Sequence, residues 1–274
     1  MDDDAADGNS VRLCEMTEEL LYEKRGDIGW ATFNRPQARN ALTFAMYEGL
    51  AETCTRISKA GEVKALVVTG AGDKAFAAGT DIAQFKAFKG GEDGIGYERK
   101  MDQTLDTIER CAVPTIAAIS GFCTGGGAAI AAVCDLRLAA ANAQFGFPIS
   151  RTLGNCLSMS NYARLAALIG PQRVKEMIFL AKLMDAPAAL AAGLVSEVVP
   201  DAAALHVRAE EVARTVAGHA PLTLQVTKEA LRRLQARIAD ESIDDLIRLA
   251  YGSADFREGM AAFLEKRTPK WTGA

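Results

Sequence analysis

The chain has 274 residues, with 31 Lys and Arg against 35 Asp and Glu and a formal net charge of −4. Hydrophobic residues make up 49% and charged residues 24%, which is typical of globular proteins and excludes extensive disorder. The acidic balance argues against nucleic acid or an anionic membrane surface as the main partner. A chain of this length suits one large α/β domain.

The N-terminus, MDDDAADGNS, is acidic and polar and has no apolar core, so it does not resemble a signal peptide. We expect residues 1–16 to form a disordered leader. Six cysteines without CxxC spacing indicate reduced thiols in a cytoplasmic protein. With two histidines, His206 and His219, we expect no metal site.

Apolar strands alternate with helices in the first half of the chain. This alternation predicts a mainly parallel sheet covered on both faces. Glycines divide the uncharged residues 111–134 into a strand, a turn and the start of a helix, so we expect no membrane span there. Residues 85–99 are rich in glycine and charge, which predicts a mobile loop beside the ligand site. The predicted elements are strands at 28–34, 63–72, 114–121 and 135–140 and a helix at 42–60.

The second half is mostly helical, with one short strand candidate at 195–199. Because few strands remain to be covered, the apolar faces of these helices must pack on the sheet or on other subunits. A homo-oligomer is therefore expected. The predicted helices are 157–170, 171–182, 187–193, 201–218, 221–238, 240–252 and 254–266.

Two glycine-centred turns dominate the candidate chemistry. AFAAGTDI (75–82) follows the strand at 63–70 and opens a helix at about Asp81, and GFCTGGGAAIAA (121–132) follows the strand at 115–120 and opens a helix at about Gly126. Each turn places main-chain N–H donors at the start of a helix, and glycine lets a ligand approach the main chain. If the two turns meet, their donors can form an oxyanion hole.

Seven segments occur in an order and spacing that resemble the crotonase superfamily, also called the enoyl-CoA hydratase/isomerase family. The resemblance covers residues 17–273. The segments are TFNRPQARNAL (32–42), KAFAAGTDI (74–82), GFCTGGGAAIAAVCDLRLAA (121–140), AQFGFP (143–148), AAGLVSEVVP (191–200), APLTLQVTKEAL (220–231) and EGMAAFLEKRTPKWTG (258–273).

The resemblance implies an α/β fold with a ββα spiral core and a C-terminal helical trimerisation region. The core with the CoA site would span residues 17–200, and the helical region residues 201–274. A homotrimer or a dimer of trimers is implied. The substrate would be an acyl-CoA thioester, acted on by a crotonase-type lyase or isomerase, with coenzyme A entering as part of the substrate and no separate cofactor.

Site residues also follow from the resemblance. The oxyanion-hole N–H groups fall on Thr80 and Gly126. Phe263 and Lys266 match positions that reach the nucleotide end of CoA, across a subunit boundary. The remaining substrate-binding positions are Gln37, Ala38, Arg39, Ala78, Asp81 and Ile82.

Hydratases of this family use two glutamates as acid and base. The first position is Ala129 in this chain, and the second is Ile149 or Ser150, depending on where a one-residue insertion is placed. None of these side chains exchanges a proton near neutral pH. Standard enoyl hydration is therefore not expected.

Several groups could replace the glutamates. Ser150, Asn155 and Ser158 are catalytic candidates, although serine and asparagine are also common in turns and helix caps. Arg151 could bind a substrate carboxylate, as a decarboxylase would require. A non-catalytic acyl-CoA-binding protein remains an alternative. Carboxylates in or after the predicted loop could also move into the site: Glu92, Asp93, Glu98 and Asp102.

Overall fold

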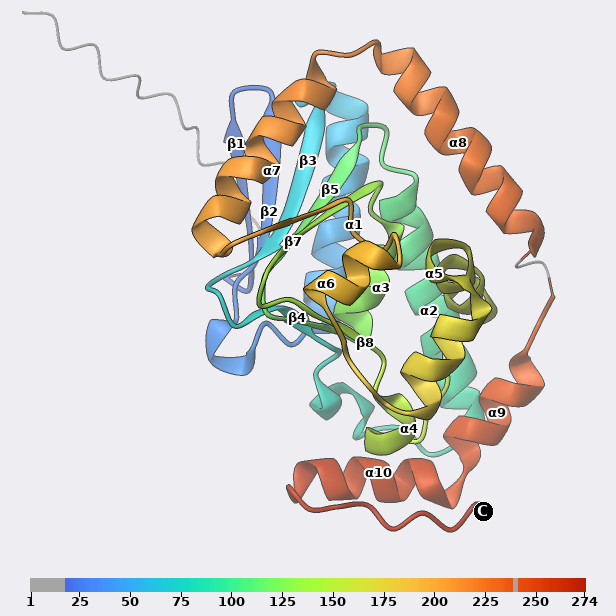
Figure 1. The fold of residues 1–274 in the computed structure, drawn as a ribbon. Helices are drawn as coiled ribbons and strands as arrows, with labels where there is room; N and C mark the ends of the chain where they lie inside the picture. The colour runs from blue at the N-terminus through green and yellow to red at the C-terminus, as the bar shows by residue number, and fades with distance from the viewer. Residues whose placement is uncertain (1–17, 239–240) are drawn as a thin grey trace, which may run out of the picture.

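The larger of two sheets has six strands. The computed structural model describes residues 18–238 and 241–274, and the predicted leader at 1–16 lies outside them. β1 is antiparallel to β2, and all other neighbours are parallel, which confirms the predicted mainly parallel sheet (Figure 1). In spatial order the strands are β1 (Leu20–Arg25), β2 (Ile28–Phe33), β3 (Ala65–Gly70), β5 (Thr115–Ile119), β7 (Leu136–Ala140) and β10 (Glu197–Val199).

Both faces of this sheet are buried. Successive side chains of a strand point to opposite sides, so neighbouring residues of one strand join different apolar clusters. Phe33 and Val68 join a large apolar cluster with helix α1 (Phe44–Ala60). Trp30 and Val67 pack on the other side, against apolar side chains of helix α7 (Ala202–Ala217). The two-sided cover predicted from the sequence is confirmed.

The smaller sheet was not predicted. β4 (Ala75–Ala78), β6 (Phe122–Thr124) and β8 (Gln144–Gly146) run parallel, and β9 (Met184–Asp185) is antiparallel to β8. Strands of two to four residues are too short for an alternating pattern to show. These short strands set the positions of the two glycine turns. The turns follow β4 and β6, which are neighbours in the small sheet, and do not follow β3 and β5 directly.

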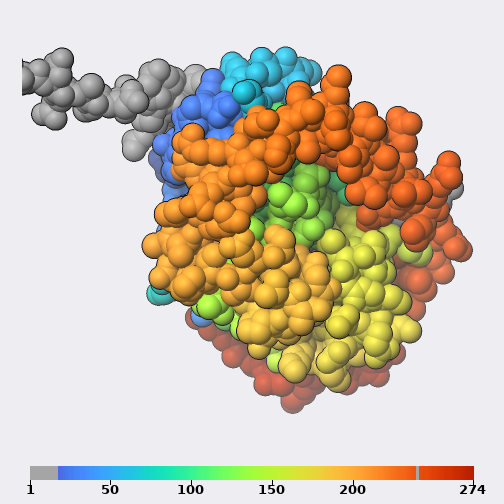
Figure 2. Space-filling view, turned by 45° about the horizontal axis from the view of Figure 1, so that its top comes forward, coloured from blue at the N-terminus to red at the C-terminus, as the bar shows by residue number. Residues whose placement is uncertain are grey.

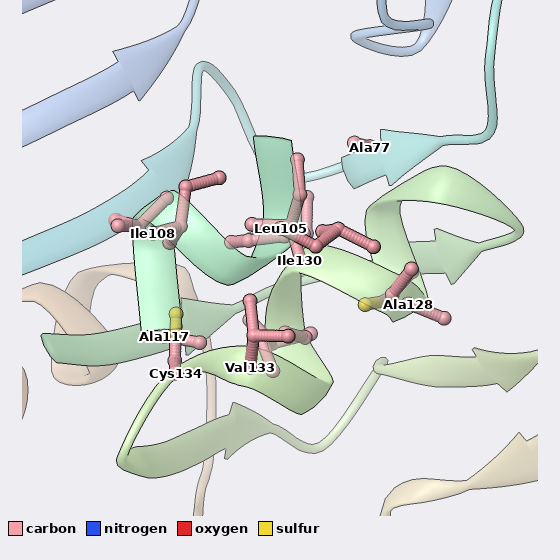
Figure 3. Packing of buried hydrophobic residues seen from close by; sticks show 14 of the residues in the cluster. Ala77, Leu105, Ile108, Ala117, Ala128, Ile130, Val133 and Cys134 are labelled. Atoms are coloured by element: carbon pink, nitrogen blue, oxygen red, sulfur yellow. The ribbon is translucent and has the colours of Figure 1, made fainter. Parts of the chain in front are cut away.

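Helix α3 (Gly126–Val133) packs beneath β4, and its first turn lies close to that strand. A Cβ on Gly127 would lie 2.3 Å from the carbonyl oxygen of Ala77, so glycine permits this approach. Farther along α3, Ile130 lies beside Leu105 in the core (Figure 3). The second turn is thereby anchored to the middle of the molecule.

The segment predicted as a mobile loop at 85–99 is largely helical, so that prediction is wrong. Helix α2 begins at Gly91 and extends to Glu109. Its buried side chains include Ile95, Met101 and Leu105, and burial of this face stabilises the helix despite its glycines. The glycine-rich composition concealed the helix from sequence reasoning.

The C-terminal half is helical, as predicted. α5 bends at Gly170, which has φ +78° and precedes Pro171, and this break separates the two helices predicted there. In Figure 1, α8 projects from the body and α10 lies at the far end, beneath α4. The helices are α4 (Ile149–Thr152), α5 (Met159–Phe179), α6 (Ala186–Ala191), α8 (Pro221–Ile238), α9 (Asp244–Gly252) and α10 (Ala254–Leu264).

Within the described ranges, no helix is both long and apolar enough to cross a membrane. The 111–134 segment forms β5, β6 and α3 together with their connections, as its glycines predicted. The five cysteines in these ranges are free thiols.

Helix α2 packs closely on α9, and glycine determines how closely. A Cβ on Gly94 would lie 2.3 Å from Cγ of Tyr251, whereas a Cβ on Gly96 would have no neighbour within 4 Å. The two positions therefore form a matched pair within one helix.

We expect Gly94→Ala to lower the free energy of unfolding by about 1–3 kcal/mol, because the added methyl overpacks the α2–α9 contact. Gly96→Ala should raise it by up to about 1 kcal/mol through helix propensity. Chemical denaturation of both variants beside the parent chain measures the difference. Equal effects of the two substitutions would contradict this account of the packing.

Candidate active site

A cavity of about 200 Å³ lies where the ends of β4 and β6 meet helices α2, α4 and α10. Thr80 and Gly126, from the two glycine turns, both line it. The family resemblance implied that the amides of both turns serve one oxyanion hole, and the geometry of the turns decides what the cavity can bind.

The first turn is fixed by main-chain hydrogen bonds to the loop before α1. The Leu42 amide donates to the Gly79 carbonyl at 2.8 Å, and the Asp81 amide donates to the Leu42 carbonyl at 2.8 Å. Gly79 has φ +86°, a left-handed conformation that glycine adopts readily. Between these bonded residues, the Thr80 amide has no hydrogen-bond acceptor among the residues described.

The second turn closes against the first. Gly125 has φ +50°, and its amide donates to the Gly146 carbonyl at 2.9 Å. A Cβ on Gly125 would lie 3.3 Å from Cα of Gly79, so the two turns are in contact. Gly126 begins α3, and its amide, too, has no acceptor in the described part of the chain. Two free N–H donors thus belong to adjoining turns that line one cavity.

Three hydroxyl groups form a chain beside these donors. The Thr80 hydroxyl is hydrogen-bonded to the Tyr47 hydroxyl at 2.9 Å and to the Tyr97 hydroxyl at 3.0 Å. A Cβ on Gly126 would lie 1.7 Å from the Tyr47 hydroxyl oxygen, so the phenol occupies the space that a side chain would need. Burial raises the pKa of both tyrosines, which therefore remain neutral at physiological pH.

Glu98 of α2 brings a carboxyl group to the same cavity. It is 5% exposed and accepts a hydrogen bond from the Tyr251 hydroxyl at 2.5 Å. The Asn155 side-chain amide donates to that same hydroxyl at 3.2 Å. Burial, with a smaller contribution from nearby Asp102, raises the pKa of Glu98 to about 8, although the Tyr251 hydrogen bond opposes the shift.

Most of the remaining wall is apolar. Ala129 and Ile149, two of the positions proposed for the family's glutamates, both line the cavity. Among the described lining residues, Glu98 alone carries a carboxyl group, and none is Lys or Arg. Other apolar lining residues are Phe85, Met101, Leu105, Leu153 and Leu157.

Of the three catalytic candidates after β8, which are Ser150, Asn155 and Ser158, Asn155 alone lines the cavity. Ser150 is exposed, and its hydroxyl donates to the Ile178 carbonyl. Ser158 caps α5, which is the alternative role named for it in the sequence analysis, and its hydroxyl donates to Asp102 at 2.7 Å. Arg151 is exposed and outside the lining, so the structure gives no support to its binding a substrate carboxylate here.

The three other candidate carboxylates, in and after the predicted loop, lie outside the lining of the cavity. Glu92 and Asp93 are exposed in the first turn of α2, where the Asp93 carboxylate accepts hydrogen bonds from the main-chain amides of Lys89 and Gly90. Asp102 is also outside the lining and is held by Ser158.

Three of the residues expected to bind substrate line the cavity: Ala78, Ile82 and Phe263. Phe263 comes from α10 of the same chain. The Asp81 carboxylate caps the short helix η2 (Ile82–Phe85) and accepts two hydrogen bonds from Arg35 at 3.1 Å.

The remaining expected positions lie outside the cavity lining. Gln37 and Ala38 form the short helix η1 (Pro36–Ala38), and Arg39 ends it with its guanidinium 5.1 Å from the centre of the Phe122 ring. Lys266 follows α10 on the surface.

The tyrosines of the site were not found from the sequence. Tyr47, Tyr97 and Tyr251 lie on three helices and belong to no short motif, so no local signal identified them. Glu98 was one of four carboxylates under consideration, and nothing in the sequence distinguished it from the others.

Comparison with known proteins shows the family of the chain. A family model described as enoyl-CoA hydratase/isomerase matches residues 23–274. A short-chain-enoyl-CoA hydratase of Clostridium acetobutylicum is 34% identical over 256 residues, which cover 90% of this chain and 95% of the relative.

Two solved structures show the same fold. An enoyl-CoA hydratase/carnithine racemase from Magnetospirillum magneticum is 34% identical, with a TM-score of 0.75, 93% of this chain covered and 96% of that one. A methylmalonyl-CoA decarboxylase in complex with 2-nitronate-propionyl-CoA is 28% identical, with a TM-score of 0.83 and coverages of 93% and 99%.

The hydroxyl chain makes the Thr80 side chain important for stability. We expect Thr80→Val to lower the free energy of unfolding by about 1–3 kcal/mol, because the Tyr47 and Tyr97 hydroxyls lose their shared partner. Thr80→Ser keeps the hydroxyl and should retain most of the stability. Denaturation curves test this, and a Val variant as stable as the Ser variant would refute it.

Proposed function

Since the chain belongs to the enoyl-CoA hydratase/isomerase family of the crotonase superfamily, we propose that it is an enzyme that transforms an acyl-CoA thioester through an enolate. The observation that carries this proposal is the pair of free amides, on Thr80 and Gly126, in two glycine turns that touch. A thioester carbonyl placed between them would accept both hydrogen bonds. Negative charge that develops on its oxygen would then be stabilised.

The physical setting suits this role. Both donors belong to the main chain and are held by neighbouring hydrogen bonds, so they need no rearrangement when charge develops. The apolar wall lowers the local dielectric and strengthens their effect. One donor of this kind is worth about 10²–10³-fold in rate.

Standard enoyl hydration is not part of the proposal. The family resemblance expects the two glutamates at Ala129 and at Ile149 or Ser150, and none of these side chains exchanges a proton. Ala129 and Ile149 line the cavity. The hydratases among the relatives therefore support the substrate class more strongly than they support the reaction.

The similarity to a methylmalonyl-CoA decarboxylase keeps decarboxylation as a second candidate. It also uses an oxyanion hole and needs no glutamate base. A non-catalytic acyl-CoA-binding protein would have the same cavity. Comparison of products with binding separates these possibilities.

We further propose that the coenzyme A part of the substrate runs along the loop before α1 and past the end of α10. The resemblance assigns Gln37, Ala38, Arg39, Asp81 and Lys266 to this part, and all five lie outside the lining of the acyl cavity. No separate cofactor is proposed, and the protein is placed in the cytoplasm.

Gly126 offers a direct test of the oxyanion hole, with a matched control. Gly126→Ala keeps the N–H and adds a Cβ beside Tyr47, whereas Gly126→Pro adds a Cβ at the same place and removes the N–H. Relative to the Ala variant, we expect the Pro variant to lose about 10²–10³-fold in kcat.

The measurement is mass-spectrometric detection of products after incubation with enoyl-, β-hydroxyacyl-, malonyl-type and aromatic CoA thioesters. A product formed by the parent chain and lost in the Pro variant identifies the reaction. Bound thioester with no product from any member would favour the non-catalytic protein. Rapid hydration of crotonyl-CoA would contradict the exclusion of standard hydration.

We also propose that the chain forms a homotrimer or a dimer of trimers. Helix α8 has no buried residue, and it carries exposed apolar side chains along its length: Leu222, Val226, Leu231, Leu234 and Ile238. Figure 2 shows α7 and α8 arching over a hollow in the molecule. Such an apolar surface is typical of an interface.

Light scattering after gel filtration should give a mass three or six times the chain mass of 29.1 kDa. Combined Leu231→Glu and Leu234→Glu substitutions should lower the assembly state, because each places a charge on the apolar surface. Thr215→Glu on α7 controls for added charge. A parent chain that elutes as a monomer would overturn the proposal.

A further inference from the structure

We infer that Glu98 is the proton-transferring group of this cavity, acting at the carbon next to the thioester carbonyl, and that Tyr251 and Asn155 position it. The inference rests on the proposed acyl-CoA function and adds to it the acid–base group. It assigns the proton chemistry to α2, whereas the resemblance assigns it to α3 and α4.

The first observation is location. Glu98 lines the same cavity as Thr80 and Gly126, whose amides would hold the thioester oxygen. Its side chain is buried, and it forms no ion pair with any described residue. A buried carboxyl group without a cation is costly unless it is neutral or has another role, so its presence in this wall needs an explanation.

The second observation is the support around the carboxyl group. The Tyr251 hydroxyl donates to Glu98 Oε1 at 2.5 Å, and the Asn155 amide donates to the Tyr251 hydroxyl at 3.2 Å. Tyr251 is itself fully buried and packs on Phe256, with ring centres 4.8 Å apart. The carboxyl group is therefore held in one position against the cavity, as a proton-transferring group must be.

The other titratable groups that face Glu98 are acidic or neutral. They come from every side: from α1, from α2 itself, from the segment before α5, from α5 and from α9. They are Tyr47, Tyr97, Asp102, Cys156, Tyr162 and Tyr251. Burial and Asp102 raise the pKa of Glu98 to about 8, close to the range in which a carboxyl group can both accept and return a proton.

The step balances without any co-reactant. The Glu98 carboxylate takes a proton from the carbon next to the carbonyl, and the electron pair of that C–H bond forms the C=C bond of the enolate. The carbonyl oxygen takes the negative charge and is held by the Thr80 and Gly126 amides. The protonated Glu98 then returns a proton to the same carbon, or to the γ-carbon of an unsaturated chain, which shifts the double bond.

The test follows hydrogen exchange in D₂O with 3-butenoyl-CoA, whose α-hydrogens are acidified by the thioester and by the double bond. Mass spectrometry measures deuterium in the recovered thioester. We expect exchange by the parent chain and a loss of about 10²–10⁴-fold in Glu98→Gln. Glu92→Gln makes the same chemical change on an exposed part of α2 and should exchange like the parent.

The pH profile separates a positioning role from a structural one. Because the carboxylate form accepts the proton, exchange should rise with pH through about 8 and then level off. Tyr251→Phe removes a hydrogen bond that lowers this pKa, so its midpoint should move to higher pH. Asp102→Asn removes a charge that raises the pKa, so its midpoint should move to lower pH. Midpoints that do not move in either variant would refute the roles of Tyr251 and Asp102 in setting the pKa of Glu98.

The outcomes also separate this inference from the proposed function. If Glu98→Gln is folded by circular dichroism and exchanges like the parent, while Gly126→Pro does not exchange, the inference fails and the proposed function stands. A parent chain that binds the thioester without exchange also overturns the inference. A parent chain that binds no CoA thioester overturns the proposed function itself.

Discussion

The structure depends on keeping two main-chain amides free inside the protein. Thr80 and Gly126 are half-buried and line the cavity, and their N–H groups stay free only because the neighbouring residues that the structure describes offer them no acceptor. The buried Asn40 side chain contributes by donating to the Ala75 carbonyl at 2.7 Å, which fixes β4 just before the first turn. Gly79 and Gly125 then bring the turns into contact. The loop before α1, the small sheet and the start of α3 all serve this one requirement.

The Glu98 carboxyl group and its partner Tyr251 belong to a different part of the molecule from the two turns. Tyr251 and Phe256 form a small apolar cluster with Ile95 at the start of α2, separate from the core beneath the large sheet. This cluster seats α9 against α2 and supports the Glu98 carboxyl group. The turns that follow β4 and β6 of the small sheet thus supply the fixed hydrogen-bond donors, while helices α2 and α9 supply the ionisable group and its partner. Such a division would let the reaction change while the proposed oxyanion hole stays the same.

Much of the fold followed from the sequence, because long apolar strands and amphipathic helices have clear periods. β4 and β6 were missed because they are too short for a period, and α2 was missed because glycines weaken its pattern. The family resemblance pointed to Thr80 and Gly126, which both line the cavity, but it left the second glutamate position open. Helix α4 turns Ile149 into the cavity and Ser150 out of it. The bond between Tyr251 and Glu98 joins residues 153 positions apart, which no local pattern reveals.

The place of Tyr251 in the chain also bears on how the protein is made. Tyr251 lies on α9, whereas Glu98 and the two glycine turns come from earlier parts of the sequence. Glu98 and both turns emerge before α9 during synthesis, so the Glu98 carboxyl group has no Tyr251 hydroxyl as donor until α9 folds onto α2. The site is therefore complete only after α9 has packed on α2, which makes its assembly a late step in the folding of each chain.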